Sequence, residues 1–354
     1  MIREWMPLER CSAITGPVFE QHTRCGHVEC SDRLRSILEK LPAEIPVREP
    51  VPATEAEISR VHASGYLSWL RAQCRNHEGY DVLGDDGASA GYFVQNMFIA
   101  GFIDENTYLN PHSYEVATYA AGSAIAAADA ALSGEHCFAL VRPPGHHAAS
   151  AWAMGFCLLN NAAIAAAKAL TTVDRVAIID WDTHHGNGTQ DIFYRDGRVL
   201  YCSIHQIDGF PQTGWADETG AGAGEGSNVN APVPMDSNIG DYARVFSEIF
   251  VPALARMDPD LVIISAGQDT LSDDPVGNMQ LVPEDFTYLT GLIADATDSS
   301  LALVLEGGYG PSHPDAINAI FSALRGARTN PDLPEPSRQT EKTVRQLKKI
   351  HSLG

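Results

Sequence analysis

Short apolar runs alternate with helix-like segments from Tyr114 onward, and this alternation restricts the fold more than any other feature of the sequence. We expect strands of four or five residues at 137–141, 176–179, 199–203, 261–265 and 301–305. Four of these strands, at 137–141, 176–179, 261–265 and 301–305, each follow a helix-like segment. The helix-like segments lie at about 114–132, 161–170, 241–256 and 284–297. This order predicts an α/β fold in which a parallel sheet is sandwiched by helices.

The rest of the chain adds helices and loops to that sheet. Helices are expected at 33–41 and 54–74, and the glycine-rich stretch 214–233 is interpreted as a loop, without the lysine of a nucleotide cradle. No repeat or linker interrupts 1–330, so we predict a single domain there, with a long surface loop at 76–110. Residues 331–354 are predicted to form a C-terminal tail whose short helix docks through Val344, Leu347 and Ile350.

Charge and composition narrow the classes of function. Hydrophobic residues make up 44% of the 354 residues, which supports an extensive buried core. The 24 Lys and Arg residues stand against 45 Asp and Glu, a formal net charge of −21. That charge repels a phosphate backbone, so we expect no intrinsic nucleic-acid binding, and it favours cationic substrates. A solubilising surface or adaptation to salt would explain it equally well.

Location is predicted from what the sequence contains near its amino terminus and in its most apolar helix. The first residues are charged early and carry no apolar core of a secretory signal, and the apolar stretch 120–132 is too short to cross a bilayer. The seven cysteines are scattered and odd in number, which suits a reducing compartment. We therefore expect a cytoplasmic protein without a membrane partner, and a homo-oligomer is compatible with the sequence.

Polar clusters follow four of the predicted strands directly. They are 142–147, 180–188, 266–269 and 306–309. In open parallel sheets, ligands bind beyond the carboxyl ends of the strands, so these four segments are expected to converge on one crevice.

Asp182, His184 and Asp269 are the candidate metal ligands. Asp182 and His184 stand two residues apart on an extended segment, so their side chains leave the same face. Asp269 follows another strand and supplies a third ligand. Three nitrogen and oxygen ligands leave coordination sites open, which is typical of catalytic zinc. Asp-x-His is also a common pair without any metal.

His146, His147 and Tyr309 are the candidate catalytic residues. Adjacent imidazoles near a metal suit general acid–base work, with Asp180 and Asn187 as partners that fix their tautomers. The Tyr309 hydroxyl suits donation to a developing oxyanion. Simple loop polarity and a packing tyrosine are the alternative interpretations.

His22, Cys25, His27 and Cys30 resemble a structural zinc knuckle. Their spacing is atypical and no second ligand pair follows, so we do not expect zinc there.

Five motifs in this order resemble the histone deacetylase superfamily, which includes acetylpolyamine amidohydrolases and acetoin-utilisation proteins. They are Arg142-Pro-Pro-Gly-His-His147, Gly155-Phe-Cys-Leu-Leu-Asn-Asn161, Asp180-Trp-Asp-Thr-His-His-Gly-Asn-Gly-Thr-Gln190, Ser203-Ile-His205 and Leu305-Glu-Gly-Gly-Tyr309. The resemblance covers residues 20–325 approximately, and Asn187 is similar to the class II and bacterial branch. It implies an arginase/deacetylase-like fold and a zinc-dependent amidohydrolase that removes acetyl or other acyl groups from lysine side chains or similar amines.

The resemblance also implies roles for individual residues. His147 would be the main general base and acid, His146 would give electrostatic support, and Tyr309 would polarise the carbonyl. The substrate tunnel would be formed by Gly155, Phe156, Phe210, Val276 and, at the rim, Asn106. A structural potassium ion would be held by Asp180, Asp182, His184 and Ser203.

Two departures from the family pattern bear on the substrate. Gln268 stands where the family usually has Phe, so we expect altered packing and retained activity. Val276 stands where polyamine-selective eukaryotic enzymes have an acidic residue, which weakens an acetylpolyamine substrate without excluding it. A catalytically silent acyl-ligand-binding protein and an arginase-like binuclear manganese hydrolase are the alternatives from other classes.

Overall fold

One parallel sheet forms the centre of the molecule. The computed structural model describes residues 10–76, 104 and 106–353, and in that part of the chain eight strands run in the order β2-β1-β3-β8-β7-β4-β5-β6. Every pairing is parallel, so all carboxyl ends lie at one edge. The strands are β1 (Cys11–Ile14), β2 (Val47–Arg48), β3 (His136–Ala139), β4 (Val176–Asp180), β5 (Val199–Gln206), β6 (Asn228–Val233), β7 (Leu261–Ala266) and β8 (Leu301–Leu305).

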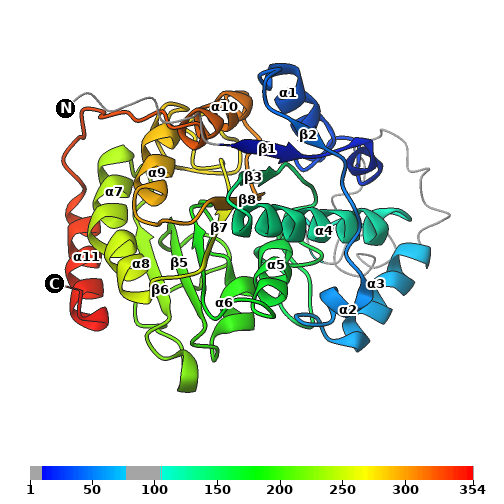
Figure 1. The fold of residues 1–354 in the computed structure, drawn as a ribbon, viewed down its shortest axis with the longest axis horizontal. Coiled ribbons are helices and arrows are strands. Elements are labelled where there is room, and N and C mark those ends of the chain that lie inside the picture. The colour runs from blue at the N-terminus through cyan, green and yellow to red at the C-terminus, as the bar shows by residue number, and fades with distance from the viewer. Residues whose placement is uncertain (1–9, 77–103, 105, 354) are drawn as a thin grey trace, which may run out of the picture.

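Helices cover both faces of this sheet (Figure 1). They are α1 (Asp32–Lys40), α2 (Glu55–Ile58), α3 (Ser64–Asn76), α4 (Ser113–Leu132), α5 (Asn161–Ala169), α6 (Asn187–Phe193), α7 (Ile239–Val245), α8 (Val251–Met257), α9 (Asp285–Ala294), α10 (His313–Leu324) and α11 (Arg338–His351). Helices α4 and α5 pack together on one face, and α9 and α10 pack together on the other. The predicted sandwich is confirmed.

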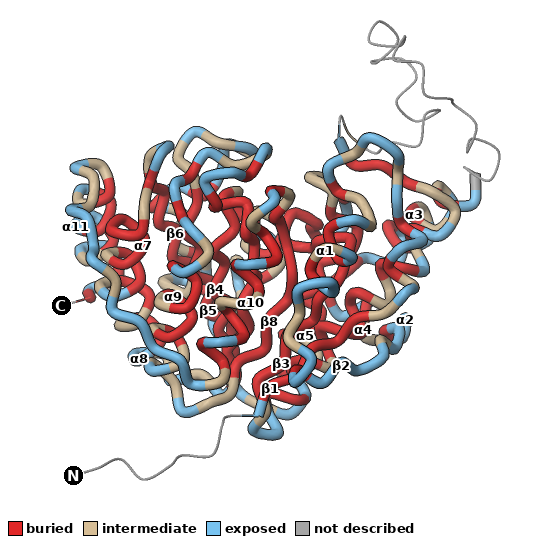
Figure 2. Tube along the Cα trace, turned by 90° about the horizontal axis from the view of Figure 1, so that it is seen from above, coloured by how far each residue is buried: buried red, intermediate tan, exposed pale blue. Residues whose placement is uncertain are grey.

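The central strands form because they are apolar on both sides. Every residue of β4, β7 and β8 is buried, as the red tube at the centre of Figure 2 shows. Helix α4 packs closely against the segment around Val51 because Gly122 has no side chain. A Cβ on Gly122 would lie 1.9 Å from the Val51 carbonyl oxygen. The sheet is therefore held rigidly from both faces, and its strand ends are fixed in space.

Several expected elements differ in detail. The helix expected at 54–74 is two helices, α2 and α3, because Thr54 and Glu57 form a capping box that starts a helix of four residues only. A π-helical turn at Phe246–Phe250 joins α7 to α8 where one helix was expected. Strand β6 lies inside the stretch interpreted as a loop: its Asn and Pro residues hide the strand pattern, and pairing with β5 creates it.

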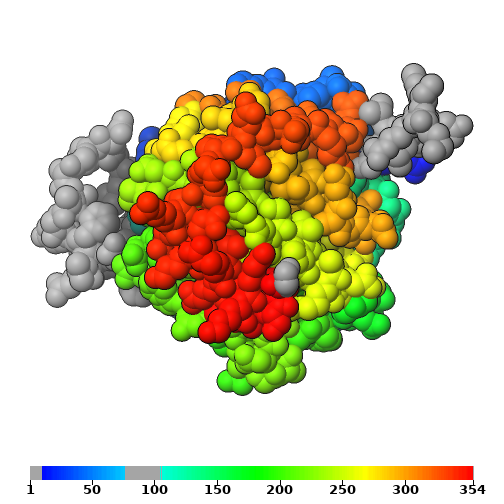
Figure 3. Space-filling view, turned by 90° about the vertical axis from the view of Figure 1, so that its left-hand side faces the viewer, coloured from blue at the N-terminus to red at the C-terminus, as the bar shows by residue number. Residues whose placement is uncertain are grey.

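Helix α11 covers the β6 edge of the sheet (Figure 3). Val344 and Leu347 are buried as expected, but Ile350 is 37% exposed, so its predicted docking role is wrong. The hydroxyl of Thr343 donates to the Pro232 carbonyl of β6 at 3.0 Å. Most of the loop predicted at 76–110 lies outside the described residues, and the boundary between domain and tail stays a prediction. Among the described helices, none has the length and apolar character needed for a membrane crossing.

Candidate active site

The three predicted metal ligands lie together at the carboxyl edge of the sheet. Asp182 and His184 follow β4, and Asp269 follows β7, its neighbour in the sheet. His184 Nδ1 lies 3.0 Å from Asp182 Oδ1 and 3.0 Å from Asp269 Oδ2. One ligand atom from each residue falls within 4.8 Å of the others. The arrangement brings two carboxylates and one imidazole to a single point.

Backbone donors fix the carboxylates of this group. Gly307 N–H donates to Asp182 Oδ2 at 2.9 Å, and Thr183 N–H donates to Asp269 Oδ1 at 2.9 Å. The remaining oxygen of each carboxylate, Asp182 Oδ1 and Asp269 Oδ2, faces the His184 ring, and Asp182 Oδ1 also accepts from His184 N–H at 2.9 Å. Both side chains are almost completely buried. Fixed ligands of this kind are what a catalytic metal centre requires.

Electrostatics show that this group is suited to a cation. Burial and the nearby Asp182 charge raise the pKa of Asp269 to about 7. Burial opposes a charge on His184 as well, but hydrogen bonds to Asp182 and Asp269 outweigh it and raise the pKa of His184 to about 10. A protonated imidazole therefore compensates the two carboxylates, as a divalent ion would. Metal binding would release that proton.

His146 and His147 lie beside the metal ligands in two different states. Their ring centroids are 4.1 Å apart. His146 Nδ1 lies 3.1 Å from Asp180 Oδ2, and His147 Nδ1 lies 2.7 Å from Asn187 Oδ1. Thus Asp180 and Asn187 are the tautomer-fixing partners that the sequence suggested.

The pKa values of the two imidazoles move in opposite directions. Burial favours a neutral His146, but the charges of Asp182 and Asp180 outweigh it and raise the pKa of His146 well above its usual value. Burial, with the charges of His146 and His184, lowers the pKa of His147 well below its usual value. When the pKa values of two neighbouring groups are shifted apart in this way, one group stays neutral and can accept a proton while the other stays charged.

Tyr309 follows β8 and is held by its backbone. Gly308 has a φ of 120°, which a side chain would strain, and this turn directs Tyr309 back toward the site. The Tyr309 ring packs edge-on against Phe156 with centroids 5.7 Å apart, and the Arg33 guanidinium lies 4.4 Å from the Tyr309 ring centroid. Burial raises the pKa of Tyr309 well above its usual value, so its hydroxyl stays protonated and able to donate.

Two aromatic rings flank the catalytic groups. Phe210 packs edge-on against His147 at 5.1 Å between centroids, and its side chain is 45% exposed. Gly155 has a φ of 55° and Phe156 a φ of 70°. A Cβ on Gly155 would lie 2.4 Å from the His147 ring, so only glycine allows this approach. Phe210 and Gly155 therefore lie against His147, and Phe156 lies against Tyr309.

The other rim residues lie farther from the catalytic groups. The Asn106 side chain is exposed, and its carbonyl accepts a hydrogen bond from His27 Nε2 at 2.9 Å. Val276 is partly exposed, and its N–H donates to Asp274 Oδ1 at 2.9 Å. No contact places either side chain against the metal ligands, so their substrate roles stay predictions.

Of the residues implied for potassium, Asp180 lies on β4 and Ser203 on β5, while Asp182 and His184 follow β4. Asp180 and Ser203 face each other in the strand register, and both are completely buried. Asp180 Oδ2 also accepts from the Tyr201 hydroxyl at 2.9 Å, and Ser203 Oγ lies 2.8 Å from His205 Nδ1.

Sequence reasoning missed four carboxyl and hydroxyl groups that hold the site. Asp274 accepts from the N–H groups of Tyr309 and Gly310 at 2.6 and 2.8 Å. Asp104 Oδ2 accepts from Gly155 N–H at 3.1 Å, and Thr107 Oγ1 accepts from Phe156 N–H at 2.9 Å. The fourth is Glu306. Only Glu306 stood inside a quoted motif, and no pattern marked the others.

Two other sets of polar residues singled out in the sequence have defined contacts. In the His22–Cys30 segment, His22 Nδ1 lies 2.8 Å from Ser113 Oγ. Gln268 is buried, and its Oε1 lies 3.0 Å from His313 Nε2, which places the amide in packing contacts. All seven cysteines lie among the described residues, and none of them forms a disulfide.

Comparisons with known proteins agree with this geometry. The family model described as "Histone deacetylase domain" matches residues 27–324. A histone deacetylase-like amidohydrolase of Pseudomonas aeruginosa is 36% identical over 335 residues, covering 90% of this chain and 82% of the relative. A probable deacetylase of Methanothermobacter thermautotrophicus is 37% identical over 336 residues, covering 93% of this chain and 95% of the relative.

A solved structure gives the same answer for the fold. The crystal structure of the HDA15 HD domain superposes with a TM-score of 0.85 at 31% identity, covering 98% of this chain and 95% of that chain. The sheet and the helices on both faces are thus those of an arginase/deacetylase fold. The chain belongs to the histone deacetylase family of amidohydrolases.

Proposed function

We propose that this protein is a zinc-dependent deacetylase that removes acetyl groups from lysine side chains of proteins or similar amines. The observation that carries the proposal is the grouping of Asp182, His184 and Asp269 beside a neutral and a charged imidazole. The donor set is suited to zinc, because two carboxylates and one imidazole leave coordination positions for water and substrate. Bound there, zinc would act as a Lewis acid toward the amide carbonyl and lower the pKa of a water.

His147 is suited to proton transfer. Because its Nδ1 donates to the Asn187 amide oxygen, the lone pair is on Nε2. Its lowered pKa keeps that nitrogen unprotonated, so it can accept a proton from the attacking water and return it to the leaving amine. His146, held charged by Asp180, stabilises negative charge that develops nearby.

Tyr309 and the tunnel walls complete the reaction. The protonated hydroxyl of Tyr309 donates to the carbonyl oxygen as it gains negative charge. Phe156 and Phe210 enclose an alkyl-amine chain between two apolar rings and exclude water from the reacting amide. The family implies that the Gly155 carbonyl accepts the scissile N–H.

An activity panel tests the proposal. Purified protein is assayed on acetyl-lysine peptides, acetylputrescine and acetylspermidine, with and without a chelator, and its zinc content is measured. We expect turnover of acetyl-lysine peptides, loss with chelator and recovery with added zinc. Preferred turnover of the acetylpolyamines would move the substrate to the alternative class. Metal-supplemented protein that binds no zinc would refute the zinc proposal, and two manganese ions per chain would favour the arginase-like alternative.

We also propose a structural potassium ion and a reducing, cytoplasmic location. The potassium proposal is supported by the buried Asp180 carboxylate facing Ser203. A higher melting temperature in potassium than in sodium chloride at equal ionic strength is expected, and equal values would contradict it. The cytoplasmic proposal is supported by seven cysteines that form no disulfide, and cell fractionation tests it.

A further inference from the structure

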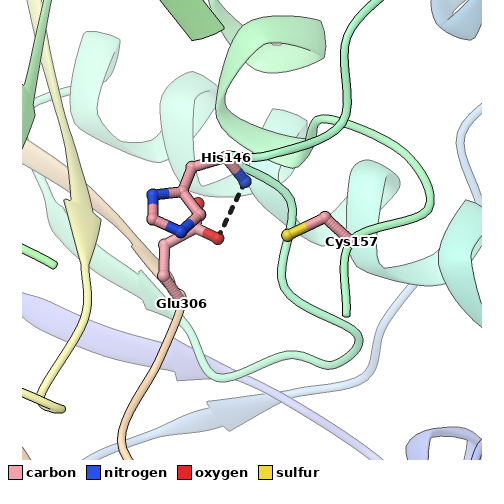
Figure 4. Close-up of side chains that lie close together, drawn as sticks. All are labelled: His146, Cys157 and Glu306. Carbon is pink, nitrogen blue, oxygen red and sulfur yellow. Dashed lines mark hydrogen bonds between the residues drawn. The ribbon is translucent and has the colours of Figure 1, made fainter. Parts of the chain in front are cut away.

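A second group of side chains that could bind a metal ion includes one of the two proposed catalytic histidines. His146, Cys157 and Glu306 are all buried, with ligand atoms within 4.8 Å of one another. Figure 4 shows the Glu306 carboxylate reaching the backbone N–H of His146, while the Cys157 side chain points toward them from another segment. The three come from the loop after β3, the segment before α5, and the end of β8.

The polar atoms of this group already have partners. His146 Nδ1 faces Asp180, and Cys157 Sγ donates to the Gly155 carbonyl at 3.3 Å. Glu306 Oε2 accepts from Gly145 N–H at 2.7 Å and from His146 N–H at 3.1 Å. Glu306 Oε1 accepts from the Ser265 hydroxyl at 3.1 Å. A metal ion would have to displace backbone donors, so the geometry favours an anchor over a ligand site.

The backbone of Glu306 is itself held by hydrogen bonds. Its N–H donates to the Ala266 carbonyl of β7 at 3.1 Å, and its own carbonyl accepts from Arg33 at 2.5 Å. The next residue, Gly307, donates to the metal-ligand carboxylate of Asp182. A single segment after β8 therefore contacts both the metal ligands and the histidine turn.

The histidine turn has little room to move. A Cβ on Gly145 would lie 2.5 Å from Asn161 N and 2.8 Å from the Leu159 carbonyl oxygen. The turn is thus packed against the start of α5 on one side and bonded to Glu306 on the other. Burial raises the pKa of Glu306 to about 7, while the nearby His146 charge and the two N–H donors lower it. Burying a carboxylate is costly unless its hydrogen bonds are used.

We propose that Glu306 is a positioning residue whose carboxylate holds the Gly145–His146 backbone, and thereby the His146 imidazole, in register with the metal ligands. This inference rests on the proposed deacetylase function. The His146 imidazole lies close to the metal ligands, with His146 Nε2 3.8 Å from Asp182 Oδ1. A displacement of about 1 Å at such a site costs on the order of 10²-fold in rate.

Two substitutions separate hydrogen-bond acceptance from charge and metal binding. In Glu306→Gln, the amide oxygen can accept both N–H groups and the NH2 can donate to Ser265 Oγ. Glu306→Leu fills similar space and accepts nothing. We expect kcat on an acetyl-lysine peptide to fall about 10²-fold in the leucine variant with KM within about twofold, and to stay within about threefold in the glutamine variant. Glutamine is a poor metal ligand, so it would fail like leucine if Glu306 held an ion.

Hydrogen exchange tests the anchor without relying on activity. The amide protons of Gly145 and His146 should exchange faster in Glu306→Leu and at the wild-type rate in Glu306→Gln. Zinc content should stay at one ion per chain in both variants. If the wild type deacetylates no substrate, the proposed function fails while this readout still decides the anchor.

A double-mutant cycle tests whether Glu306 acts through the histidine. In a His146→Ala background, Glu306→Leu should change kcat by less than about threefold, because the group it positions is gone. Ser265→Ala, which removes only the contact to the other oxygen, is the matched control and should lose less than about threefold. If the leucine variant does not fold, Glu306→Asp replaces it, since the shorter chain keeps the charge and loses the reach.

Four results would overturn the proposal. They are wild-type kcat in Glu306→Leu, equal losses in the leucine and glutamine variants, an equal loss with and without His146, and a second zinc ion that binds the wild type and not the variants.

Discussion

Two parts of the candidate site are held in place differently. We call the three candidate metal ligands the metal end, and the loop residues Gly155, Phe156 and Phe210 the rim. Asp182, His184 and Asp269 leave the ends of two adjacent central strands, and their carboxylates are bonded to backbone N–H groups. Phe156 and Phe210 belong to loops, one at a positive φ and the other 45% exposed. The metal end takes its geometry from the sheet, whereas the rim depends on a few side-chain hydrogen bonds.

This difference suggests separate roles for the metal end and the rim. A sheet buried on both faces fixes atoms that must meet within a fraction of an ångström, as bond-making chemistry requires. Loops tolerate change, so they are where substrate preference is set. We therefore expect substitutions at the metal end to abolish turnover, and those at the rim to change KM.

The largest effect is expected for Asp269→Ala. It removes one of three ligands and leaves the Thr183 N–H without its acceptor. Zinc content should fall and kcat/KM should drop by about 10³-fold or more, since the metal supplies several kcal/mol of charge stabilisation. Metal analysis and peptide assays measure both. Asp298→Asn, at an exposed position, is the matched control. Full activity of the alanine variant would remove the basis of the comparison.

Tyr309→Phe is expected to have the next largest effect. The hydroxyl is lost while the ring contacts to Phe156 and Arg33 remain. We expect kcat to fall about 10²- to 10³-fold with zinc content unchanged, as for the loss of one oxyanion donor. Tyr288→Phe on α9 is the control for removing a tyrosine hydroxyl. Unchanged turnover would mean that Tyr309 has no oxyanion role.

Loss of the side-chain hydrogen bonds that hold the rim should change KM more than kcat. Asp104→Asn weakens the bond to Gly155 N–H, and Thr107→Val removes the bond to Phe156 N–H. KM should rise about three- to tenfold for each, with kcat within about threefold, because the walls move and the metal end does not. Steady-state kinetics decide this. Larger losses in kcat than in KM would show that the rim also carries chemistry.

Acid should weaken folding through His22 and Glu29, two buried groups that contact Tyr108. Burial lowers the pKa of His22 to about 3, below its unfolded value. His22 thus contributes stability fully above its unfolded pKa of about 6.5, and this contribution is lost as pH falls toward 3. At pH 5 the loss is about 2 kcal/mol.

Glu29, 3.6 Å from His22, acts at lower pH. Its buried carboxylate faces Arg142 and has its pKa lowered to about 2, so its contribution persists above about 4.5 and is lost below. Denaturant unfolding at several pH values measures both. His22→Gln should flatten the slope between pH 6.5 and 5, and an unchanged slope would assign acid sensitivity elsewhere.

Sequence reasoning predicted which candidate residues come together, but not the groups that hold them. The meeting of the candidate metal ligands and histidines was predictable because their residue types are distinctive and each follows a strand whose end is fixed by parallel topology. Asp274 and Asp104 were not predictable, because a loop carboxylate has no pattern until the chain brings a backbone N–H to it. Strand β6 was missed for the same reason: Asn228–Val233 becomes a strand only by pairing with β5.

By itself, the sequence determined the α/β class and the family, and it identified the groups that we propose bind metal and move protons. These follow from local apolar runs and from residue chemistry, which need no partner to be recognised. Only the tertiary structure decided how those groups are held and charged. Glu306 meets Gly145 across 161 positions of sequence, and the opposite pKa shifts of His146 and His147 depend on burial and on neighbouring charges that exist only in the folded chain.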